Sequence, residues 1–189
     1  TIEGRVISIT FQITAADISG ATITLNPTSG TYTGTAYNPS VSVTLDGFGT
    51  LVEGTDYTLS WNKTGFTNAD TYTVTVTGEG NFEGMTERTF TINAANLADV
   101  KVEQVGTLTY TGEAQYLIDG GEAAGGEMQY STDNQTWSTT IPQGTAAGEY
   151  TVYYKVVGDE NHSDTAVASI EVTIAKAQAV ITVDTTTIT

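Results

Sequence analysis

Apolar and polar residues alternate one by one along several short stretches of the chain. The clearest stretch runs from Ala69 to Phe82, where Tyr72, Val74 and Val76 alternate with threonines before a turn that contains glycine. A period of two places successive side chains on opposite faces of a β-strand. Nowhere do apolar residues recur at spacings of three and four over a dozen positions, as they would in an amphipathic helix. The pattern predicts an all-β protein with almost no helix.

The same pattern returns later in the chain, from Ala147 to His162. Tyr72 and Tyr150 lie 78 positions apart, and so do Tyr32 and Tyr110, which both begin a Tyr-Thr-Gly motif. A constant spacing between similar segments is the mark of a repeat. The chain therefore contains two copies of one module.

The spacing between equivalent positions grows along the module. Asn81 and Asn161 lie 80 positions apart, and Ile92 and Ile174 lie 82 apart, so the second copy has two extra residues before its turn and two after it. Insertions of two residues keep every side chain on its own face of a strand. The spacing predicts a β-hairpin in both copies, with the second hairpin longer by one pair step on each arm.

Other alternating rows predict further strands in each copy. Short strands separated by turns at intervals of roughly 8 to 12 residues are typical of β-sandwiches, so we expect two antiparallel β-sandwiches in tandem. The rows expected to face inward are Ile23/Leu25, Val41/Val43/Leu45, Tyr57/Leu59/Trp61, Tyr72/Val74/Val76 and Phe90/Ile92 in the first copy, and Val100/Val102, Tyr116/Ile118, Met128/Tyr130, Tyr150/Val152/Tyr154/Val156 and Ile170/Val172/Ile174 in the second.

Three similar heptapeptides mark the boundaries between copies. They are ITAADIS from Ile13, INAANLA from Ile92 and IAKAQAV from Ile174. The predicted domains are residues 1–13, the closing strand of a preceding repeat; residues 14–93, the first repeat; residues 94–175, the second repeat; and residues 176–189, the start of a third.

The two ends of the chain carry their own predictions. Residues 2–5 spell a tetrapeptide used as a protease site, so a partial origin in cloning is the alternative for the first residues. Val6–Ile13 and Ala179–Ile188 alternate like strands whose partners are not in the chain. Because unpaired strands expose backbone donors and acceptors, we expect them to dock onto an edge of a complete repeat, to pair between molecules or to be mobile.

Composition narrows the classes of partner. The 189 residues include 22 Asp and Glu against 6 Lys and Arg, a net charge of −16, which disfavours nucleic acid and anionic lipid as partners. Cysteine is absent, so there is no disulfide and no cysteine-ligated metal. No apolar run approaches the ~20 residues of a membrane span, and we expect neither a span nor a signal peptide in this sequence.

Each copy carries a set of short motifs. They are Tyr32-Thr-Gly34, Glu53–Tyr57, Tyr72–Gly78, Gly80-Asn81-Phe82 and Phe90-Thr-Ile92 in the first copy, and Tyr110-Thr-Gly112, Met128–Ser131, Tyr150–Lys155, Gly158-Asp159 and Asn161-His162 in the second. Together these motifs resemble a known family, the bacterial immunoglobulin-like (MBG-type) repeats of large secreted and surface proteins. One departure is Asp70, where the family usually has an Ala-Gly pair. The resemblance implies immunoglobulin-like sandwiches in a spacer or adhesin segment, with no catalytic residues to transfer.

The sequence predicts no enzyme and no cofactor other than a possible calcium ion. His162, the one histidine, is followed by Ser163 and Asp164, but neighbouring side chains in a strand or turn point apart and cannot form a catalytic triad. Oxygen ligands for Ca²⁺ gather between Gly158 and Asp164, although this loop lacks the spacing of a known calcium loop. The candidate ligands are Asp159, Glu160, Asn161 and Asp164, and the alternative is a junction site with Asp17 or Asp99.

Exposed aromatic residues are the candidates for binding a ligand. By parity or loop position Tyr37, Phe48, Phe66 and Tyr153 are expected to face outward, whereas Trp61 and Trp137 are expected in the core. Lys101 and Lys155 are also expected to point outward. An isopeptide cross-link needs a lysine in the core, so none is predicted.

Two functions of different class remain. The first is a non-catalytic spacer or stalk segment of a bacterial secreted or surface protein, whose partners are the neighbouring repeats. The second is an adhesin or carbohydrate-binding module that captures a host glycan or matrix protein, or an accessory domain of a surface glycosidase. An extracellular location on the bacterial cell surface is expected for both.

Overall fold

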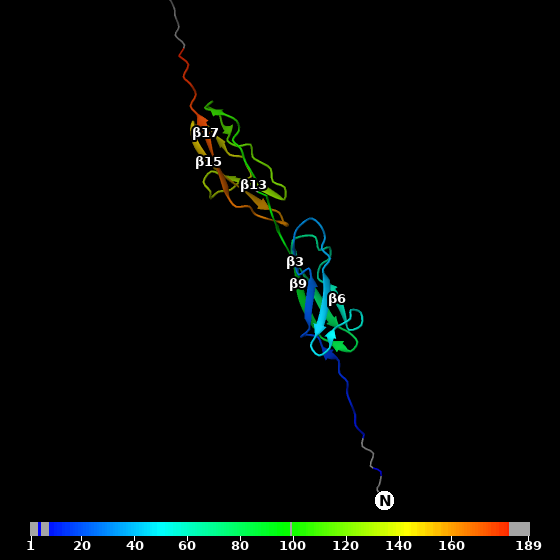
Figure 1. Cartoon of the computed structure of the whole chain (residues 1–189). Coiled ribbons are helices and arrows are strands. Elements are labelled where there is room, and N and C mark those ends of the chain that lie inside the picture. Colours follow the sequence, from blue (N-terminus) through cyan, green and yellow to red (C-terminus); the bar gives the residue numbers. More distant parts are fainter. Residues whose placement is uncertain (1–3, 5–7, 99, 182–189) are drawn as a thin grey trace, which may run out of the picture. The chain divides into compact units, whose positions relative to one another are not determined.

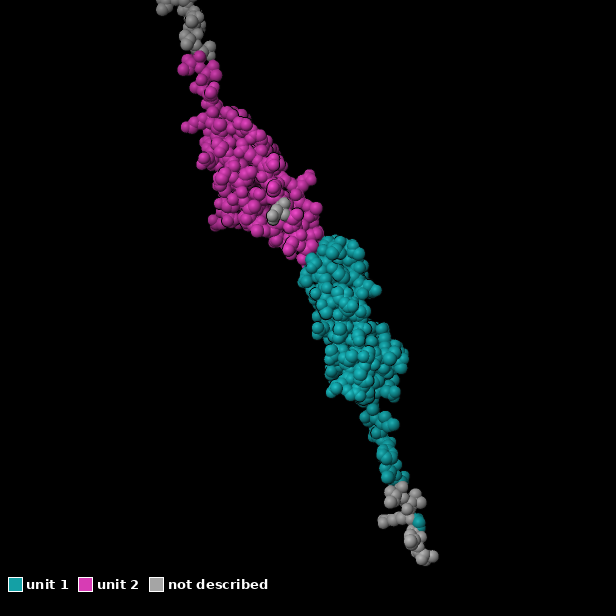
Figure 2. Space-filling model, in the orientation of Figure 1, with its two compact units in different colours: residues 1–93 teal, residues 94–189 magenta. Residues whose placement is uncertain are grey.

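A computed structural model of the chain describes residues 4, 8–98 and 100–181, and these residues are all-β, as predicted (Figure 1). No helix forms among them, so none that could cross a membrane is found there. The chain divides between Asn93 and Ala94 into two compact units (Figure 2). Residues 1–93 are called unit 1 and residues 94–189 unit 2.

Unit 1 is built from two main sheets that share one core. The three-stranded sheet has the order β2-β4-β5 and the four-stranded sheet has the order β3-β9-β7-β6, while β1 and β8 form a separate parallel pair. The strands are β1 (Ala16–Asp17), β2 (Thr22–Asn26), β3 (Ser29–Thr31), β4 (Ser40–Leu45), β5 (Gly49–Thr50), β6 (Tyr57–Trp61), β7 (Asp70–Gly78), β8 (Phe82–Glu83) and β9 (Met85–Asn93).

The core of unit 1 confirms the alternation read from the sequence. Val43 of the smaller sheet and Val74 and Phe90 of the larger sheet have no exposed surface, and all belong to one hydrophobic cluster. Between Val74 and Val76 the threonine faces away from this cluster, because strand side chains alternate between the faces. The arrangement is that of a β-sandwich.

Unit 2 repeats the larger sheet, with the order β11-β17-β15-β13, but its second layer holds only the short pair β12-β14. The parallel pair β10-β16 corresponds to β1-β8. The strands are β10 (Ala95–Asn96), β11 (Leu108–Thr109), β12 (Gln115–Tyr116), β13 (Gly126–Ser131), β14 (Gln143–Gly144), β15 (Gly148–Gly158), β16 (His162–Ser163) and β17 (Ala168–Ala175).

One predicted core residue of unit 2 is wrong. Tyr116 is 54% exposed, whereas Leu117 and Ile118 are both buried. The strand pairs with β14 as far as Tyr116, and Ile118 then bridges to Gln104. Because the chain changes partners between these positions, strict alternation breaks and two consecutive side chains face the core.

The hairpin prediction is confirmed in its register and only partly in its length. Tyr72 pairs with Phe90 between β7 and β9, and Tyr150 pairs with Val172 between β15 and β17. Strand β15 has 11 residues against 9 for β7, but its pairing with β17 ends at Tyr154.

Thr165 explains why the longer hairpin stops early. Its hydroxyl oxygen accepts a hydrogen bond from the backbone N–H of Val156 at 2.8 Å, and its own N–H donates to the Val156 carbonyl at 3.0 Å. A side-chain oxygen thus takes the place of a backbone carbonyl. The regular ladder cannot continue through that position, so the extra residues of the return arm lie outside β17.

The described parts of the two end segments form no strand. Phe11 and Ile13 are 85% and 95% exposed, whereas the similar residues Phe90 and Ile92 of β9 are 0% and 2% exposed. Segments 8–13 and 176–181 therefore do not dock onto a sheet edge. Pairing between molecules stays a prediction, and the parts of the predicted end strands at residues 6–7 and 182–188 lie outside the described residues.

Candidate functional site

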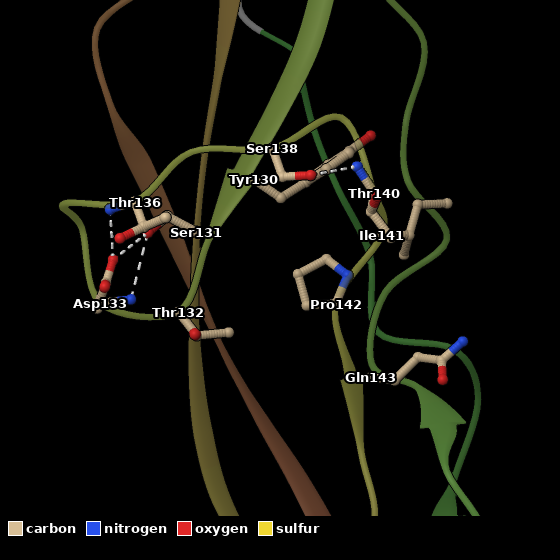
Figure 3. A pocket seen from close by; sticks show the side chains of 10 residues that line it. All are labelled: Tyr130, Ser131, Thr132, Asp133, Thr136, Ser138, Thr140, Ile141, Pro142 and Gln143. Carbon is tan, nitrogen blue, oxygen red and sulfur yellow. Dashed lines mark hydrogen bonds between the residues drawn. The ribbon is translucent and has the colours of Figure 1, made fainter.

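The hollow of unit 2 that is richest in hydroxyl groups lies beside the loop from β13 to β14 (Figure 3). Its cavity volume is about 430 Å³. The lining residues come from the end of β13, the loop that follows it and the first residue of β14. The polar lining residues are Ser131, Thr132, Asp133, Thr136, Ser138, Thr140 and Gln143, and Ile141 and Pro142 are apolar.

Asp133 organises one side of this hollow. Its Oδ1 accepts hydrogen bonds from the hydroxyl of Ser131 at 2.8 Å and from the backbone N–H of Thr136 at 2.7 Å (Figure 3). The backbone N–H of Gln135 donates a third at 2.8 Å. The backbone N–H groups of Thr136 and Gln135, followed by the Ser131 hydroxyl, hold the pKa of Asp133 far below its usual range. A carboxylate stabilised in this way shapes the loop and is a poor general base.

The other side is held by Tyr130, whose side chain is 4% exposed. Its hydroxyl donates a hydrogen bond to the carbonyl of Gly120, and burial raises the pKa of the phenol, with the charge of Asp119 adding to the effect. The Ser138 hydroxyl accepts a hydrogen bond from the N–H of Thr140 at 3.0 Å. The lining contains no histidine, lysine or arginine, so it offers hydrogen bonds and no activated nucleophile.

Acid is expected to weaken unit 2 through Asp133. Because the pKa of Asp133 is lower in the folded state than in the unfolded chain, its contribution to stability is present above about pH 4 and is lost as the pH falls towards the folded pKa. Asp133→Asn should lower the melting temperature of unit 2 at pH 7, and the difference from the unmodified chain should shrink between about pH 4 and pH 2. Melting curves recorded by circular dichroism at pH 7, pH 4 and pH 2 measure this difference. A difference that stays constant with pH would contradict it.

Two of the predicted calcium ligands, Asp159 and Asp164, accept hydrogen bonds within their own turn. Asp159 Oδ1 accepts the N–H of Asn161 at 2.8 Å and lies 2.7 Å from His162 Nδ1, while Asp164 Oδ1 accepts the N–H of Gly158 at 2.9 Å. The Asn161 N–H, followed by His162, lowers the pKa of Asp159. No cluster of three or more His, Cys, Asp or Glu suited to a metal occurs in the described residues. Calcium binding with Glu160 in this turn stays a prediction, and Asp99 of the alternative site lies outside the described residues.

His162 and its neighbours have structural roles in the same turn. His162 and Ser163 form β16, which pairs with Ala95 and Asn96. The imidazole lies against Gly125, where an added Cβ would come within 2.5 Å of Nδ1. The Asp164 carboxylate accepts a hydrogen bond from the backbone of the turn.

Two of the four candidate ligand-binding aromatics belong to the core of unit 1, which corrects the expectation that they face outward. Tyr37 packs edge-on against Phe90 at a ring distance of 5.7 Å. Phe66, with a left-handed φ of 36°, packs against Trp61 and Tyr72 at 4.9 Å each. Both are loop residues, and strand parity does not fix the direction of a loop side chain.

The other two aromatics are more accessible. Phe48 is 59% exposed and its ring lies 5.3 Å from that of Phe82. Tyr153 is half-buried on the face of β15 opposite to Val152, because alternate strand residues face opposite ways. A ligand-binding role for Phe48 or Tyr153 stays a prediction.

Trp137 lies outside the hydrophobic cluster of unit 2, which differs from its expected core position. The Nζ atom of Lys155 sits 4.6 Å from the centre of the Trp137 ring, a cation–π contact. Lys155 points away from the core, as predicted, and Lys101 is exposed. Trp61 does pack against the core of unit 1. The outer face of β15 therefore carries Tyr153 and Lys155, with Trp137 over the lysine.

Sequence reasoning missed Asp133 and its hollow. The usable signal was local: serine, aspartate and asparagine at positions 131, 133 and 134 are residues that bond the backbone two positions on and tolerate left-handed angles, and Asn134 has a φ of 56°. No protein-family model matches the chain, and no curated protein matches it. The likeness to MBG-type repeats remains a resemblance.

Proposed function

We propose that the chain is a non-catalytic, load-bearing spacer segment of a bacterial secreted or surface protein. The observation that carries this proposal is the path of the chain through unit 1. The chain enters at Ala16, which pairs with Phe82 beside the hairpin turn, and leaves at Asn93, the last residue of β9. Strand β9 has 9 residues and spans roughly 30 Å, so entry and exit lie at opposite ends of the hairpin.

Unit 2 has the same path. Ala95 pairs with His162 beside the turn, and the chain leaves β17 at Ala175, the far end of the hairpin. Only Ala94 separates β9 from β10 in the sequence. A module that receives the chain at one end and releases it at the other adds length with every copy, which is what a spacer requires.

The surface chemistry supports the same proposal. A net charge of −16 favours solubility and mutual repulsion of neighbouring chains. In the hollow beside the loop from β13 to β14, Asp133 and Ser138 accept hydrogen bonds from the loop backbone. These bonds maintain the loop and supply no reacting group.

Capture of a host glycan or matrix protein is the second candidate. It is favoured by one observation, the outer face of β15, which carries Tyr153 and Lys155, with Lys155 in contact with the Trp137 ring. Aromatic rings beside a polar group are the usual components of a sugar-binding surface. Capture on a glycan array that is abolished by Tyr153→Ala would establish this function, and a clean negative would leave the spacer alone.

The spacer proposal is tested by stretching the unmodified chain between its two ends with optical tweezers or an atomic force microscope. Because each unit is closed around its own core, we expect it to resist extension and then to yield in one cooperative step. Gradual lengthening at low force, without discrete steps, would contradict a load-bearing role.

A further inference from the structure

A short strand runs parallel to the last strand of unit 1. Strand β3 lies beside the end of β9, with Ser29 opposite Thr91, Gly30 opposite Ile92 and Thr31 opposite Asn93. The N–H of Tyr32 adds a hydrogen bond to the carbonyl of Asn93 at 2.8 Å. An early segment of the unit is thereby bonded to the strand through which the chain leaves.

The parallel direction of these strands decides how they respond to tension. A pull on the entering chain passes through β1 and β2 before it draws β3 by its first residue, Ser29, towards the entry end of the hairpin. A pull on the leaving chain draws β9 by its last residue, Asn93, towards the exit end. Two parallel strands pulled in this way slide along each other, so their hydrogen bonds are loaded together rather than opened one after another.

Unit 2 has a shorter pair at the same place. Strand β11 lies parallel to β17, with Leu108 opposite Ile174 and Thr109 opposite Ala175. The N–H of Tyr110 donates to the carbonyl of Ala175 at 2.8 Å, as Tyr32 does in unit 1. The β11–β17 pair therefore contains two residue pairs, whereas the β3–β9 pair of unit 1 contains three.

Tyr37 fastens the free side of β3. Its hydroxyl donates to the carbonyl of Thr31 at 2.7 Å and accepts from the N–H of Thr31 at 3.1 Å. The ring lies over Gly30, where an added Cβ would come within 2.4 Å of the ring. Strand β3 is therefore held by β9 on one side and by Tyr37 on the other.

Asn93 adds a further side-chain bond, since its Nδ2 donates to the carbonyl of Gly30 at 3.1 Å. In unit 2 the position of Tyr37 is taken by Gln115, 78 residues on, whose Nε2 donates a single bond to the carbonyl of Thr109 at 3.1 Å. The position of Asn93 is taken by Ala175, whose side chain has no hydrogen-bonding group.

We propose that these parallel pairs are the clamps that carry tension and that the clamp of unit 1 is the stronger, so unit 2 opens first. This inference rests on the proposed load-bearing function. Tyr37, a candidate ligand-binding residue by sequence, is thereby assigned as a positioning residue that holds β3 in place. Unit 1 has three parallel residue pairs against two in unit 2, and three side-chain hydrogen bonds hold β3 against one that holds β11.

The test stretches the full chain at constant force and follows Tyr37→Phe, which removes the hydroxyl and keeps the ring. Ten Gly and Ser residues inserted between Glu122 and Ala123, outside any strand, lengthen the step of unit 2 and so identify it. Losing the Tyr37 hydroxyl should make unit 1 open roughly 3- to 10-fold faster.

The matched control is Tyr72→Phe, which removes a hydroxyl bonded to the carbonyl of Asn68 at 3.1 Å, outside the clamp. We expect less than about a 2-fold change in the opening rate under force, although each variant loses a hydrogen bond. A second variant, Gln115→Ala, alters an exposed bond of unit 2 and should speed the longer step alone.

The outcomes separate the clamp from the spacer. If Tyr37→Phe and Tyr72→Phe change the opening rate equally, the clamp is overturned. If the longer step occurs last, the ranking of the two clamps is overturned. In both cases the chain still opens in discrete steps, so the load-bearing spacer stands. Absence of discrete steps in the unmodified chain overturns both. The proposal is supported if the longer step occurs first and if Tyr37→Phe, but not Tyr72→Phe, accelerates the shorter step.

Discussion

Replacing Phe90 by alanine is expected to lower the free energy of unfolding of unit 1 by about 3–5 kcal/mol. Phe90 has no exposed surface, and its ring lies 5.7 Å from that of Tyr37 and 6.4 Å from that of Phe66. The variant loses this burial and leaves a cavity between the sheets. Urea unfolding in a Trp137→Phe background, where Trp61 is the one tryptophan, measures unit 1 alone.

The control for this prediction is Phe48→Ala. Phe48 is 59% exposed and contacts Phe82 at the edge of the core, so its loss should cost less than about 1 kcal/mol. The unfolding of unit 2, followed by Trp137 fluorescence in a Trp61→Phe background, should not change with either variant. Equal losses for the two phenylalanines, or a matching loss in unit 2, would show that the core has been misplaced.

Alanine at Gly78 or Gly158 is expected to destabilise the unit that contains it by about 2–3 kcal/mol. The two glycines lie 80 positions apart, where each long strand is crossed by the returning chain. An added Cβ would lie 2.7 Å from the backbone nitrogen of Glu83 in unit 1 and 2.1 Å from the backbone oxygen of His162 in unit 2. Backbone atoms cannot swing aside as the tip of a side chain can. Calorimetric melting of both variants checks the loss.

Gly20→Ala is the matched substitution, because a Cβ at Gly20 meets no atom within 4 Å. It should change stability by no more than about 0.5 kcal/mol. A loss as large for Gly20→Ala as for Gly78→Ala would mean that the close approach of the returning chain is not the cause.

The fold was predictable where alternation and repetition act together. Tyr72 and Tyr150 occupy equivalent places opposite Phe90 and Val172, because insertions of two residues preserve strand faces. The predicted inward orientation was wrong at Tyr116, where the strand changes its pairing partner. The alternation within a single strand does not encode such a change. The early end of β17 pairing has a similar origin, since a threonine hydroxyl replaces a carbonyl in the ladder.

The functional residues were harder to predict because their roles depend on distant contacts. Tyr37 faces Gly30 and Thr31, and the need for a glycine under its ring is visible only once the loop is folded. Asp133 acts within its own loop, so its role could have been inferred from the turn residues around it. Alternation says nothing about either side chain, since both lie between strands.

The most direct test of the central claim is the extension of the unmodified chain at each step when it is stretched. The claim is that two separate modules each resist tension and then open as a whole. Releasing about 80 residues lengthens the chain by on the order of 250 Å, after the roughly 30 Å span of the folded hairpin is subtracted. The account predicts two steps of this size. One step of twice the size, or a continuous extension without steps, would contradict it.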